Sequence, residues 1–327
     1  MTQAIVAALV PAAVAWAVIA ILLRMPWTAG LSDQPNERSL HAIPTPRIGG
    51  IGILAGVAAV SFPPGPLALT LGCALALWCI SFADDMRGLP VAVRFLAHLA
   101  AATVAVTALA GPLDGIAALA PWVIAILAVA WATNLYNFMD GADGIAGGMT
   151  VIGFAAYAIA AAIAGAQGLV WISAAIASAA AGFLVHNFPP ARVFLGDSAS
   201  IPLGFLAAML GLHGIVAGTW MLAFPLLVFS PFVVDATVTL VRRLVRGEVP
   251  WHAHRSHGYQ RLVLAGWSRQ RLALSAYALM LAAAGSAFAL EAAGFMLQCG
   301  IILGWIVSYA LILLAIERKT KRIAPAP

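Results

Sequence analysis

Amides and carboxylates recur at three-residue spacing where a long apolar stretch ends, at Asn134, Asn137, Asp140 and Asp143. If the helix continues, this spacing places the four side chains along one face. Polar groups that interrupt an apolar stretch of membrane length are costly and usually functional. The glycines that follow allow close approach to the backbone, and a helix starting there offers N–H groups to a phosphate. The segment is hard to explain by packing and predicts a functional site.

Two other acidic segments have the same character. Asp84 and Asp85 end an apolar stretch, where carboxylates face the unfavourable end of the helix dipole and favour a counter-charge or a metal. Neighbouring residues on a helix point about 100° apart, so one can face a site and the other a structural partner. Asp197 directly precedes an apolar stretch and is a hard oxygen donor of the kind that Mg²⁺ uses together with substrate phosphates.

Basic and imidazole side chains gather in two further segments. The first, from Asp33 to Gly50, contains Arg38, His41 and Arg47 among prolines, and taken alone it also fits an ordinary solvated loop. The second runs from Trp251 to Arg261 and holds three histidines and two arginines, which suit an anionic ligand. Its His-x-His-x-x-His spacing is not a helical zinc motif, so zinc is the minor alternative.

The composition determines which elements must position these residues. Hydrophobic residues make up 63% of the 327 residues and charged residues only 9%, against about 25% in an ordinary soluble domain. The apolar stretches are too long and uniform for barrel strands, so helices must satisfy the backbone in lipid. We therefore expect an all-α, polytopic transmembrane bundle forming a single domain over residues 1–327, with about eleven spans and ten as the alternative count. The expected spans are 4–23, 48–62, 67–83, 94–110, 121–138, 149–165, 169–187, 201–216, 219–241, 272–290 and 295–316.

The charges are distributed on one side of these spans. All 17 Lys and Arg, and ten of the twelve acids, belong to alternate connections or to the helix ends that border them. These connections are 24–47, 84–93, 139–148, 188–200, 242–271 and the tail after 316. By the positive-inside rule this face is cytoplasmic, which predicts a periplasmic N-terminus, a cytoplasmic C-terminus and a multi-pass protein of the bacterial inner membrane. The basic pI therefore indicates a membrane face and not a nucleic-acid partner.

Taken in order, these segments resemble the polyprenyl-phosphate N-acetylhexosamine-1-phosphate transferases, the MraY/WecA-type enzymes of glycosyltransferase family 4. The resemblance runs from about Asp33 to Arg261. The motifs that carry it are Pro44-Thr45-Pro46-Arg47 with Gly49-Gly50, Asp84-Asp85, Asn137-x-x-Asp140-Gly141-x-Asp143-Gly144 and Phe194-Leu195-Gly196-Asp197-Ser198.

The resemblance implies transfer of an N-acetyl-aminosugar 1-phosphate from a UDP-sugar to a polyprenyl phosphate, such as undecaprenyl phosphate, with release of UMP. It implies Mg²⁺, for which Mn²⁺ could substitute, with Asp197 as metal ligand. The expected catalytic residues are Asp84, Asp85, Asp140 and Asp143. The expected substrate-binding residues are Arg38, His41, Arg47, Asn134, Asn137, Asn187, Arg255, His257, Tyr259 and Gln260. A homodimer is compatible with the sequence but not specified by it.

The last basic segment departs from the usual family pattern. Only His257 matches the histidine cluster of most members, and Tyr259 and Gln260 follow it. This resembles the WbpL-type subgroup that initiates O-antigen, the polysaccharide of lipopolysaccharide, or related envelope glycans. It favours a 6-deoxy aminosugar such as FucNAc or QuiNAc, with UDP-GlcNAc as the close alternative. The rival function, a membrane transporter, predicts acids near the bilayer midplane and polar groups on both faces, which the bare outer loops do not provide.

Overall fold

The computed structural model describes residues 2–35, 43–60, 67–111, 119–249 and 254–321, and its elements are almost all helices. In chain order the helices are α1 (Thr2–Leu22), η1 (Pro26–Leu31), α2 (Gly49–Ala58), α3 (Leu67–Arg87), α4 (Val91–Ala110), α5 (Leu119–Phe138), α6 (Ile145–Ile163), α7 (Gln167–Asn187), α8 (Asp197–Val216), α9 (Ala223–Val228), α10 (Ser230–Val245), α11 (Gly258–Leu264), α12 (Arg269–Glu291) and α13 (Phe295–Lys321). Two short strands, β1 (Ser32–Asp33) and β2 (Thr45–Pro46), pair antiparallel. The expected all-α bundle is confirmed.

A helix stands at each of the eleven expected spans, but not every one is long enough to cross a membrane alone. In the described part of the chain, eight helices meet that length and apolar composition: α3, α4, α5, α6, α7, α8, α12 and α13. The expected span 48–62 is only the ten-residue α2. The helix α1 has 21 residues, and its part with described side chains, Leu9–Leu22, is apolar. Counting apolar stretches therefore found the helices but overstated the length of α2.

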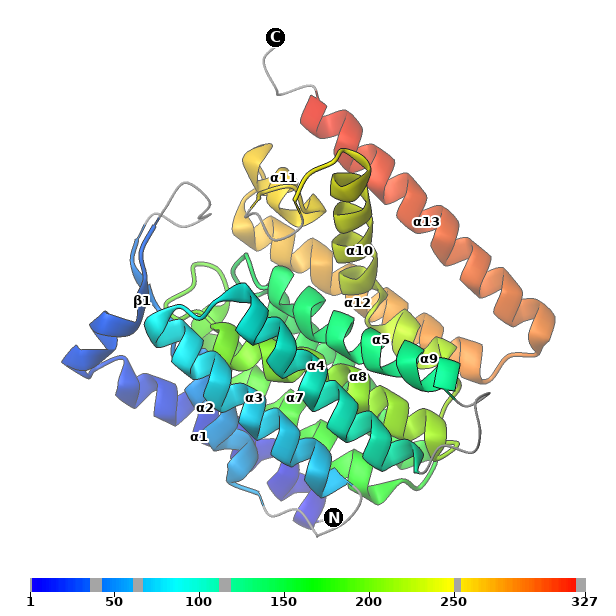
Figure 1. The fold of residues 1–327 in the computed structure, drawn as a ribbon, viewed down its shortest axis with the longest axis horizontal. Coiled ribbons are helices and arrows are strands. Elements are labelled where there is room, and N and C mark those ends of the chain that lie inside the picture. The colour runs from blue at the N-terminus through cyan, green and yellow to red at the C-terminus, as the bar shows by residue number, and fades with distance from the viewer. Residues whose placement is uncertain (1, 36–42, 61–66, 112–118, 250–253, 322–327) are drawn as a thin grey trace.

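The expected span 219–241 is divided into two helices. The chain breaks at Phe229, and α10 rises away from the direction of α9 (Figure 1). Pro231 lies in the first turn of α10, where the missing N–H costs nothing and the fixed φ favours a helix start. The indole of Trp131 on α5 donates to Thr237 Oγ1 at 3.1 Å and fastens α10 to α5. Hydropathy alone could not show this break because both helices are apolar.

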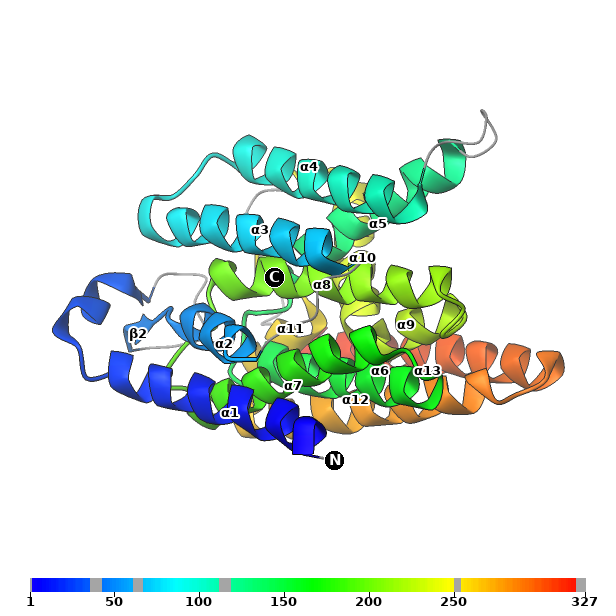
Figure 2. The ribbon, with the colours of Figure 1, turned by 90° about the horizontal axis from the view of Figure 1, so that it is seen from below.

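The buried centre of the protein is formed by α6, α7 and α8. In Figure 2, α8 lies in the middle, with α3 and α4 on one side of it and α7 and α1 on the other. Phe183 on α7 and Phe205 on α8 are completely buried. By contrast, α13 stands at the edge of the bundle and exposes most of its apolar side chains, as expected of a helix that faces lipid (Figure 1).

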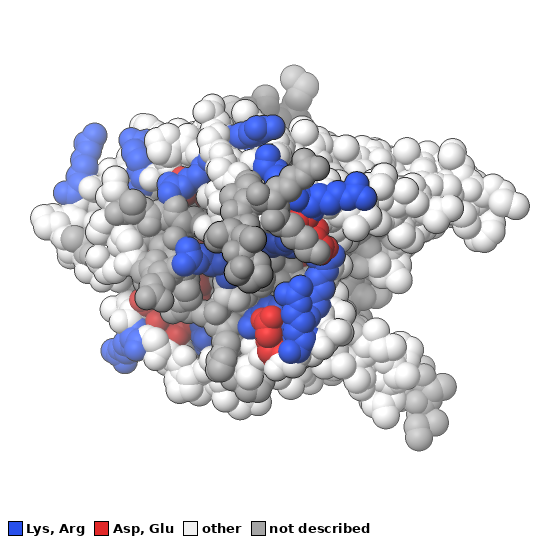
Figure 3. Space-filling model, turned by 90° about the horizontal axis from the view of Figure 1, so that it is seen from above, with Lys and Arg blue, Asp and Glu red and all other residues white. Residues whose placement is uncertain are grey.

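The charged side chains gather on one face of the molecule. Figure 3 shows Lys and Arg side chains across this face with acidic side chains among them. The start of α1 and the end of α13 lie at opposite ends of the molecule (Figure 1). The charged side chains of the described residues thus gather on a single side of the bundle.

Candidate active site

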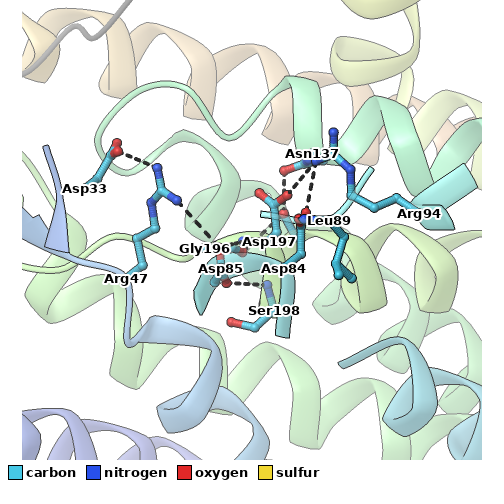
Figure 4. Close-up of polar contacts among 11 residues, drawn as sticks. Asp33, Arg47, Asp84, Asp85, Leu89, Arg94, Asn137, Gly196, Asp197 and Ser198 are labelled. Atoms are coloured by element: carbon cyan, nitrogen blue, oxygen red, sulfur yellow. Dashed lines mark hydrogen bonds and ion pairs between the residues drawn. The ribbon is translucent and has the colours of Figure 1, made fainter. Parts of the chain in front are cut away.

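The carboxylate of Asp85, near the end of α3, is bound to the start of α8. Its two oxygens accept hydrogen bonds from the backbone N–H groups of Asp197 at 3.2 Å and Ser198 at 3.0 Å (Figure 4). The N–H groups in the first turn of a helix lack partners within the helix, and the dipole favours negative charge there. Gly196 precedes this turn at φ +78°, and a Cβ on it would lie 3.0 Å from Asp85 Oδ2. The negative charge of Asp85 at the end of α3 is therefore stabilised by the N–H groups at the start of α8.

The segment after β2 is joined by backbone hydrogen bonds to the segment before α8. Phe194 N donates to Pro46 O at 2.9 Å. In return, Gly49 N donates to Phe194 O and Gly50 N to Leu195 O, both at 3.0 Å. Two of the motifs that the sequence singled out, almost 150 residues apart, thus form one backbone unit.

This unit brings Arg47 to the carboxylates of Asp85 and Asp33. The guanidinium Nη1 of Arg47 lies 3.8 Å from Asp85 Oδ1, and Nη2 is paired with the carboxylate of Asp33 on β1 (Figure 4). The Arg47 side chain is 36% exposed, so the guanidinium also reaches the surface of the site. Arg47 therefore lies at the surface of the site between the carboxylates of Asp33 and Asp85.

Arg94 on α4 was not among the expected site residues, yet it joins two of them. Its Nη1 lies 3.0 Å from Asp84 Oδ2 and 3.5 Å from Asp197 Oδ2 (Figure 4). The other oxygen of Asp84 accepts from the backbone N–H of Leu89. The only sequence signal for Arg94 was a cation directly after the expected connection 84–93, which begins with two acids.

Asn137 and Asp140 bring the end of α5 to the same place. Ser200 Oγ donates to Asn137 Oδ1 at 2.8 Å, which ties α5 to the first turn of α8. Burial, followed by the neighbouring carboxylates of Asp197 and Asp85, raises the pKa of Asp140 well above its usual range. Negative charge in this part of the site is therefore incompletely compensated, even with Arg47 nearby.

Asn134 lies one turn deeper than Asn137 on α5. Its Nδ2 donates to Ala130 O at 2.7 Å within the same helix, and its side chain also contacts His98 on α4. The four polar residues at three-residue spacing therefore do not share one continuous helical face, because α5 ends at Phe138 before Asp140 is reached.

Asp143 and Asn187 form a separate network that joins two connections. Asn187 Oδ1 accepts from Gly144 N at 2.9 Å, and its Nδ2 donates to Val193 O at 2.8 Å. Asp143 Oδ2 accepts from Ala191 N at 3.1 Å and lies 3.3 Å from Arg269 Nη1. In this structure these two side chains hold the α5–α6 and α7–α8 connections together.

The second basic segment of the sequence, residues 251–261, is the fifth of the segments singled out above, and we call it the fifth basic segment. Its described residues, 254–261, are arranged around Asp235 of α10. This carboxylate accepts from the backbone N–H groups of Gly258 at 2.8 Å and Tyr259 at 3.2 Å, so it stabilises the start of α11 as Asp85 does that of α8. His257 Nδ1 lies 3.7 Å from Asp235 Oδ1. Sequence reasoning missed this role of Asp235, although a lone acid in an apolar helix was the signal for it.

Tyr259 connects this segment to the Asp140 connection. Its hydroxyl donates to Phe138 O at 2.9 Å, and a Cβ on Gly141 would lie 2.1 Å from that hydroxyl oxygen. Burial, then the carboxylates of Asp235 and Asp140, raises the pKa of Tyr259 well above its usual range. Tyr259 is therefore a neutral donor beside the acid cluster.

The remaining members of the fifth segment differ in their contacts. Gln260 is buried and accepts from the backbone N–H of His257 at 3.3 Å. Burial, followed by His257 and Arg243, lowers the pKa of His254 to about 4, so its imidazole is neutral near pH 7. Among the residues that the structure describes, Arg255 forms no hydrogen bond or ion pair, which leaves its guanidinium available to a ligand.

The donor set of the acid cluster fits Mg²⁺ only if a substrate completes the site. Carboxylate oxygens are the ligands this ion prefers, and it is usually held by one or two of them plus phosphates. Both oxygens of Asp85 are taken by backbone N–H groups, which leaves Asp197 and Asp140 as donors. Within the described ranges, no three His, Cys, Asp or Glu side chains are grouped closely enough to hold a metal by themselves.

The structure thus brings most of the expected residues to one face of the bundle. The acid cluster, as we call it below, consists of Arg47, Asp84, Asp85, Arg94, Asn137, Asp140 and Asp197. Tyr259 adjoins it through the Asp140 connection, whereas Asp143 and Asn187 belong to the neighbouring network. Two expected binding residues, Arg38 and His41, lie outside the described residues.

The sequence of this chain is similar to those of known glycosyl transferases, and the matched region contains the helices of the acid cluster. Residues 67–235, which include all the helices of the acid cluster, match the model of glycosyl transferase family 4. The chain is 29% identical over 319 residues to a probable undecaprenyl-phosphate N-acetylglucosaminyl 1-phosphate transferase of Bacillus subtilis, covering 92% of this chain and 89% of that protein.

Two further relatives have slightly higher identity over shorter alignments. An undecaprenyl-phosphate alpha-N-acetylglucosaminyl 1-phosphate transferase of Yersinia pestis is 30% identical over 273 residues, covering 75% of this chain and 73% of that protein. A phospho-N-acetylmuramoyl-pentapeptide-transferase of Moorella thermoacetica is 33% identical over 288 residues, covering 76% of this chain and 84% of that protein.

Proposed function

This chain belongs to glycosyl transferase family 4, and we propose that it transfers an N-acetyl-aminosugar 1-phosphate from a UDP-sugar to undecaprenyl phosphate, releasing UMP. The observation that carries the proposal is the acid cluster, in which carboxylates from three different segments meet two arginines at the charged end of the membrane helices. A site of this composition suits phosphates and a divalent cation, and its place in the bundle suits a lipid acceptor.

The reaction joins two polyanions, so the main task of the protein is charge compensation and positioning. The attacking group is an oxygen of the lipid phosphate, and the bond that breaks joins the β-phosphorus to the oxygen that leaves with UMP. Because the second pKa of a phosphate monoester is about 6, the acceptor is largely a dianion near pH 7 and needs little help from a base. Arg47 and Arg94 are the side chains that would hold the phosphates.

The metal is part of the proposal. Mg²⁺, or Mn²⁺ in its place, would supply positive charge beside the diphosphate, where Asp197 and Asp140 are the donors available to hold it. In the structure Arg94 lies against Asp197, so this guanidinium has to turn toward a phosphate when the carboxylate takes a cation. Burial, and after it repulsion from Asp197 and Asp85, raises the pKa of Asp140, and a cation bound beside these carboxylates would favour the ionised form of Asp140.

The adjacent carboxylates have distinct proposed roles. Asp84 holds Arg94 and the backbone of Leu89, so it positions a cationic side chain near the lipid phosphate. Asp85 fixes the turn that presents Asp197. Asp143 and Asn187 support the connections on which Asp140 stands, and Asn134 and Asn137 orient the end of α5.

The sugar is read, in this proposal, by the fifth basic segment. Arg255 and His257 would meet phosphate or sugar oxygens. Tyr259 donates to Phe138 O next to the Asp140 connection, and Gln260 accepts from the backbone N–H of His257. The departure from the usual histidine cluster supports a WbpL-type donor, a 6-deoxy aminosugar such as UDP-FucNAc or UDP-QuiNAc, with UDP-GlcNAc as the alternative. The proposed setting is the cytoplasmic face of a bacterial inner membrane, at the first step of O-antigen or another envelope polysaccharide.

The experiment that tests this function is product analysis with the purified protein. Undecaprenyl phosphate and Mg²⁺ are incubated with each of three donors, UDP-GlcNAc, UDP-FucNAc and UDP-QuiNAc, and the extracted lipid is weighed by mass spectrometry. A lipid-linked sugar diphosphate from at least one donor is expected. Unchanged lipid with every donor, from a folded preparation, would exclude these substrates.

A further inference from the structure

A cavity of about 480 Å³ lies between the last helices of the chain. Its walls come mainly from α10, α11, α12 and α13, with Met139 and Ile145 contributed by the connection between α5 and α6 and the start of α6, and its volume falls within the range of about 300–1,000 Å³ typical of ligand pockets. Its lining on α13 runs from Tyr309 to Lys319, which corresponds to about 15 Å of helix. The cavity is therefore long and apolar, a shape that suits a hydrocarbon chain.

One end of the cavity carries cations and an unused hydrogen-bond donor. Lys319 and Trp267 both line it, with Lys319 Nζ 5.6 Å from the centre of the indole ring. Arg271 lies on the same indole, 4.3 Å from the ring centre. The Nε1 of Trp267 is buried and has no acceptor. Among the described residues, neither Lys319 nor Arg271 is paired with a carboxylate.

The carboxylate that lines the cavity does not cancel this positive charge. Asp235 is engaged by the N–H groups of Gly258 and Tyr259 and by the hydroxyl of Thr239. Trp267 and Lys319 line this end of the cavity, and Arg271 lies over the same indole next to the lining. This group, which we call the basic mouth, therefore favours an anion with acceptor oxygens. Tryptophan, lysine and arginine side chains with these properties are typical of the level of lipid head groups.

The basic mouth is formed by residues outside the acid cluster, although the cavity itself reaches the Asp140 connection through Met139 and Tyr259. None of the lining residues belongs to α3, α4 or α8, the helices that carry Asp84, Asp85, Arg94 and Asp197. A lipid whose phosphate meets the basic mouth is thus not placed to react at the acid cluster. This difference in place favours a resident membrane lipid over the acceptor substrate.

We propose that this cavity binds one acyl chain of an anionic phospholipid, whose phosphate is held at the basic mouth. The long apolar lining accounts for the chain, and the two unpaired cations with the orphan indole N–H account for the charge of the head group. Because residues of α13 line one wall of the cavity and residues of α10 and α12 line the others, the lipid also fills space between α13 and the body of the protein. A second protein copy would have to insert a comparable anionic group, for which this chain offers little, since its charged face is mainly basic.

Native mass spectrometry of the full chain in mild detergent tests the proposal without any measurement of turnover. The delipidated protein is titrated with phosphatidylglycerol or with phosphatidylcholine of the same acyl composition. We expect one phosphatidylglycerol per chain, bound at least tenfold more tightly than phosphatidylcholine. Equal binding of the two lipids would contradict the anionic mouth.

Variants locate the lipid. Ala276→Phe places a ring in the cavity and should weaken phosphatidylglycerol binding at least tenfold, whereas Ala278→Phe, two residues along the same helix and exposed, should not. The double variant Lys319→Glu/Arg271→Glu should remove the preference for the anionic lipid without disturbing the apolar lining. Arg318→Glu, an exposed neighbour, is its control. If Ala276→Phe and Lys319→Glu/Arg271→Glu both bind phosphatidylglycerol as tightly as wild type does, the proposal is overturned.

A competition arm identifies the source of the lipid. Undecaprenyl phosphate is added to the protein loaded with phosphatidylglycerol, and the retained phospholipid is counted. Retention is expected, because the acceptor belongs at the acid cluster. Suppose instead that undecaprenyl phosphate, at a concentration equal to that of phosphatidylglycerol, displaces the phospholipid from wild type, and that Ala276→Phe no longer binds undecaprenyl phosphate. This result would assign the cavity to the acceptor and overturn the phospholipid assignment.

Discussion

Asp85 accepts the backbone N–H of Asp197 at 3.2 Å, so one acid of the site fixes the position of another that lies 112 residues later in the chain. The second oxygen of Asp85 accepts the next N–H along, from Ser198. The two adjacent carboxylates therefore have different contacts. Asp85 stabilises the turn at the start of α8, whereas Asp84 is paired with Arg94. This difference follows from the angle of about 100° between neighbouring helix positions.

The role of Asp85 predicts a loss of stability as well as of activity on its replacement. Asp85→Ala leaves two N–H groups of α8 without their acceptors, and unsatisfied buried donors cost about 1–3 kcal/mol. Asp85→Asn keeps one acceptor oxygen and should lose less stability. Thermal unfolding in detergent measures the difference. Equal unfolding temperatures for wild type and Asp85→Ala would show that the carboxylate does not support the turn.

Arg94 should contribute to turnover although the sequence gave little sign of it. In Arg94→Ala we expect kcat/KM to fall by about 10²–10³-fold, the usual effect of removing one preorganised donor from developing negative charge. Arg94→Lys should restore part of this loss, because it keeps the charge but not the planar guanidinium. Arg87→Ala, an exposed cation at the end of α3, is the matched control. An Arg94→Ala enzyme as active as Arg87→Ala would remove Arg94 from the site.

The fifth basic segment should affect the choice of sugar more than the use of lipid. A site that hydrogen-bonds a hydroxyl strongly rejects an analogue that lacks it. We therefore expect Tyr259→His/Gln260→His to shift the ratio of kcat/KM for UDP-GlcNAc and a 6-deoxy donor at least tenfold toward UDP-GlcNAc, with little change in KM for undecaprenyl phosphate. If the double variant stays active and the ratio does not move, this segment does not read the sugar.

The orientation of the bundle predicts which loops an impermeant thiol reagent can reach from the periplasm. After replacement of Cys73, Cys79 and Cys299, a cysteine at Ala217, in the exposed connection before α9, should be labelled in intact cells. A cysteine at Arg246, exposed on the charged face, should be labelled only after the cells are opened. The reverse pattern would place the acid cluster on the periplasmic side.

The sequence predicted the helices and the composition of the site because both depend on local patterns. Long apolar stretches form helices in lipid. Acids at the ends of such helices stand out in the sequence, because a charged group in or near the membrane costs free energy and is usually functional. The backbone unit of Pro46 with Phe194 could not be foreseen, because it joins segments that are distant in the chain. The break at Phe229 was hidden for another reason, since hydropathy does not distinguish one apolar helix from two.

Asp143 and Arg94 show the same limit within the site. Asp143 shares the spacing of Asn137 and Asp140, but α5 ends at Phe138, and the chain then turns Asp143 toward Ala191 and Arg269. Arg94 was counted only as a cation that marks the cytoplasmic face. Its partners on α3 and α8 became visible once those helices were packed together.

Nucleotide release tests the central claim most directly, because it identifies the bond that breaks. With the preferred UDP-sugar, undecaprenyl phosphate and Mg²⁺, we expect one UMP for each lipid product, no UMP without the lipid, and none after addition of EDTA until Mg²⁺ or Mn²⁺ is restored. Asp197→Asn, folded in detergent, should release none. Release of UDP in place of UMP, or undiminished UMP release in EDTA or by Asp197→Asn, would contradict a metal-assisted transfer of sugar phosphate at the acid cluster.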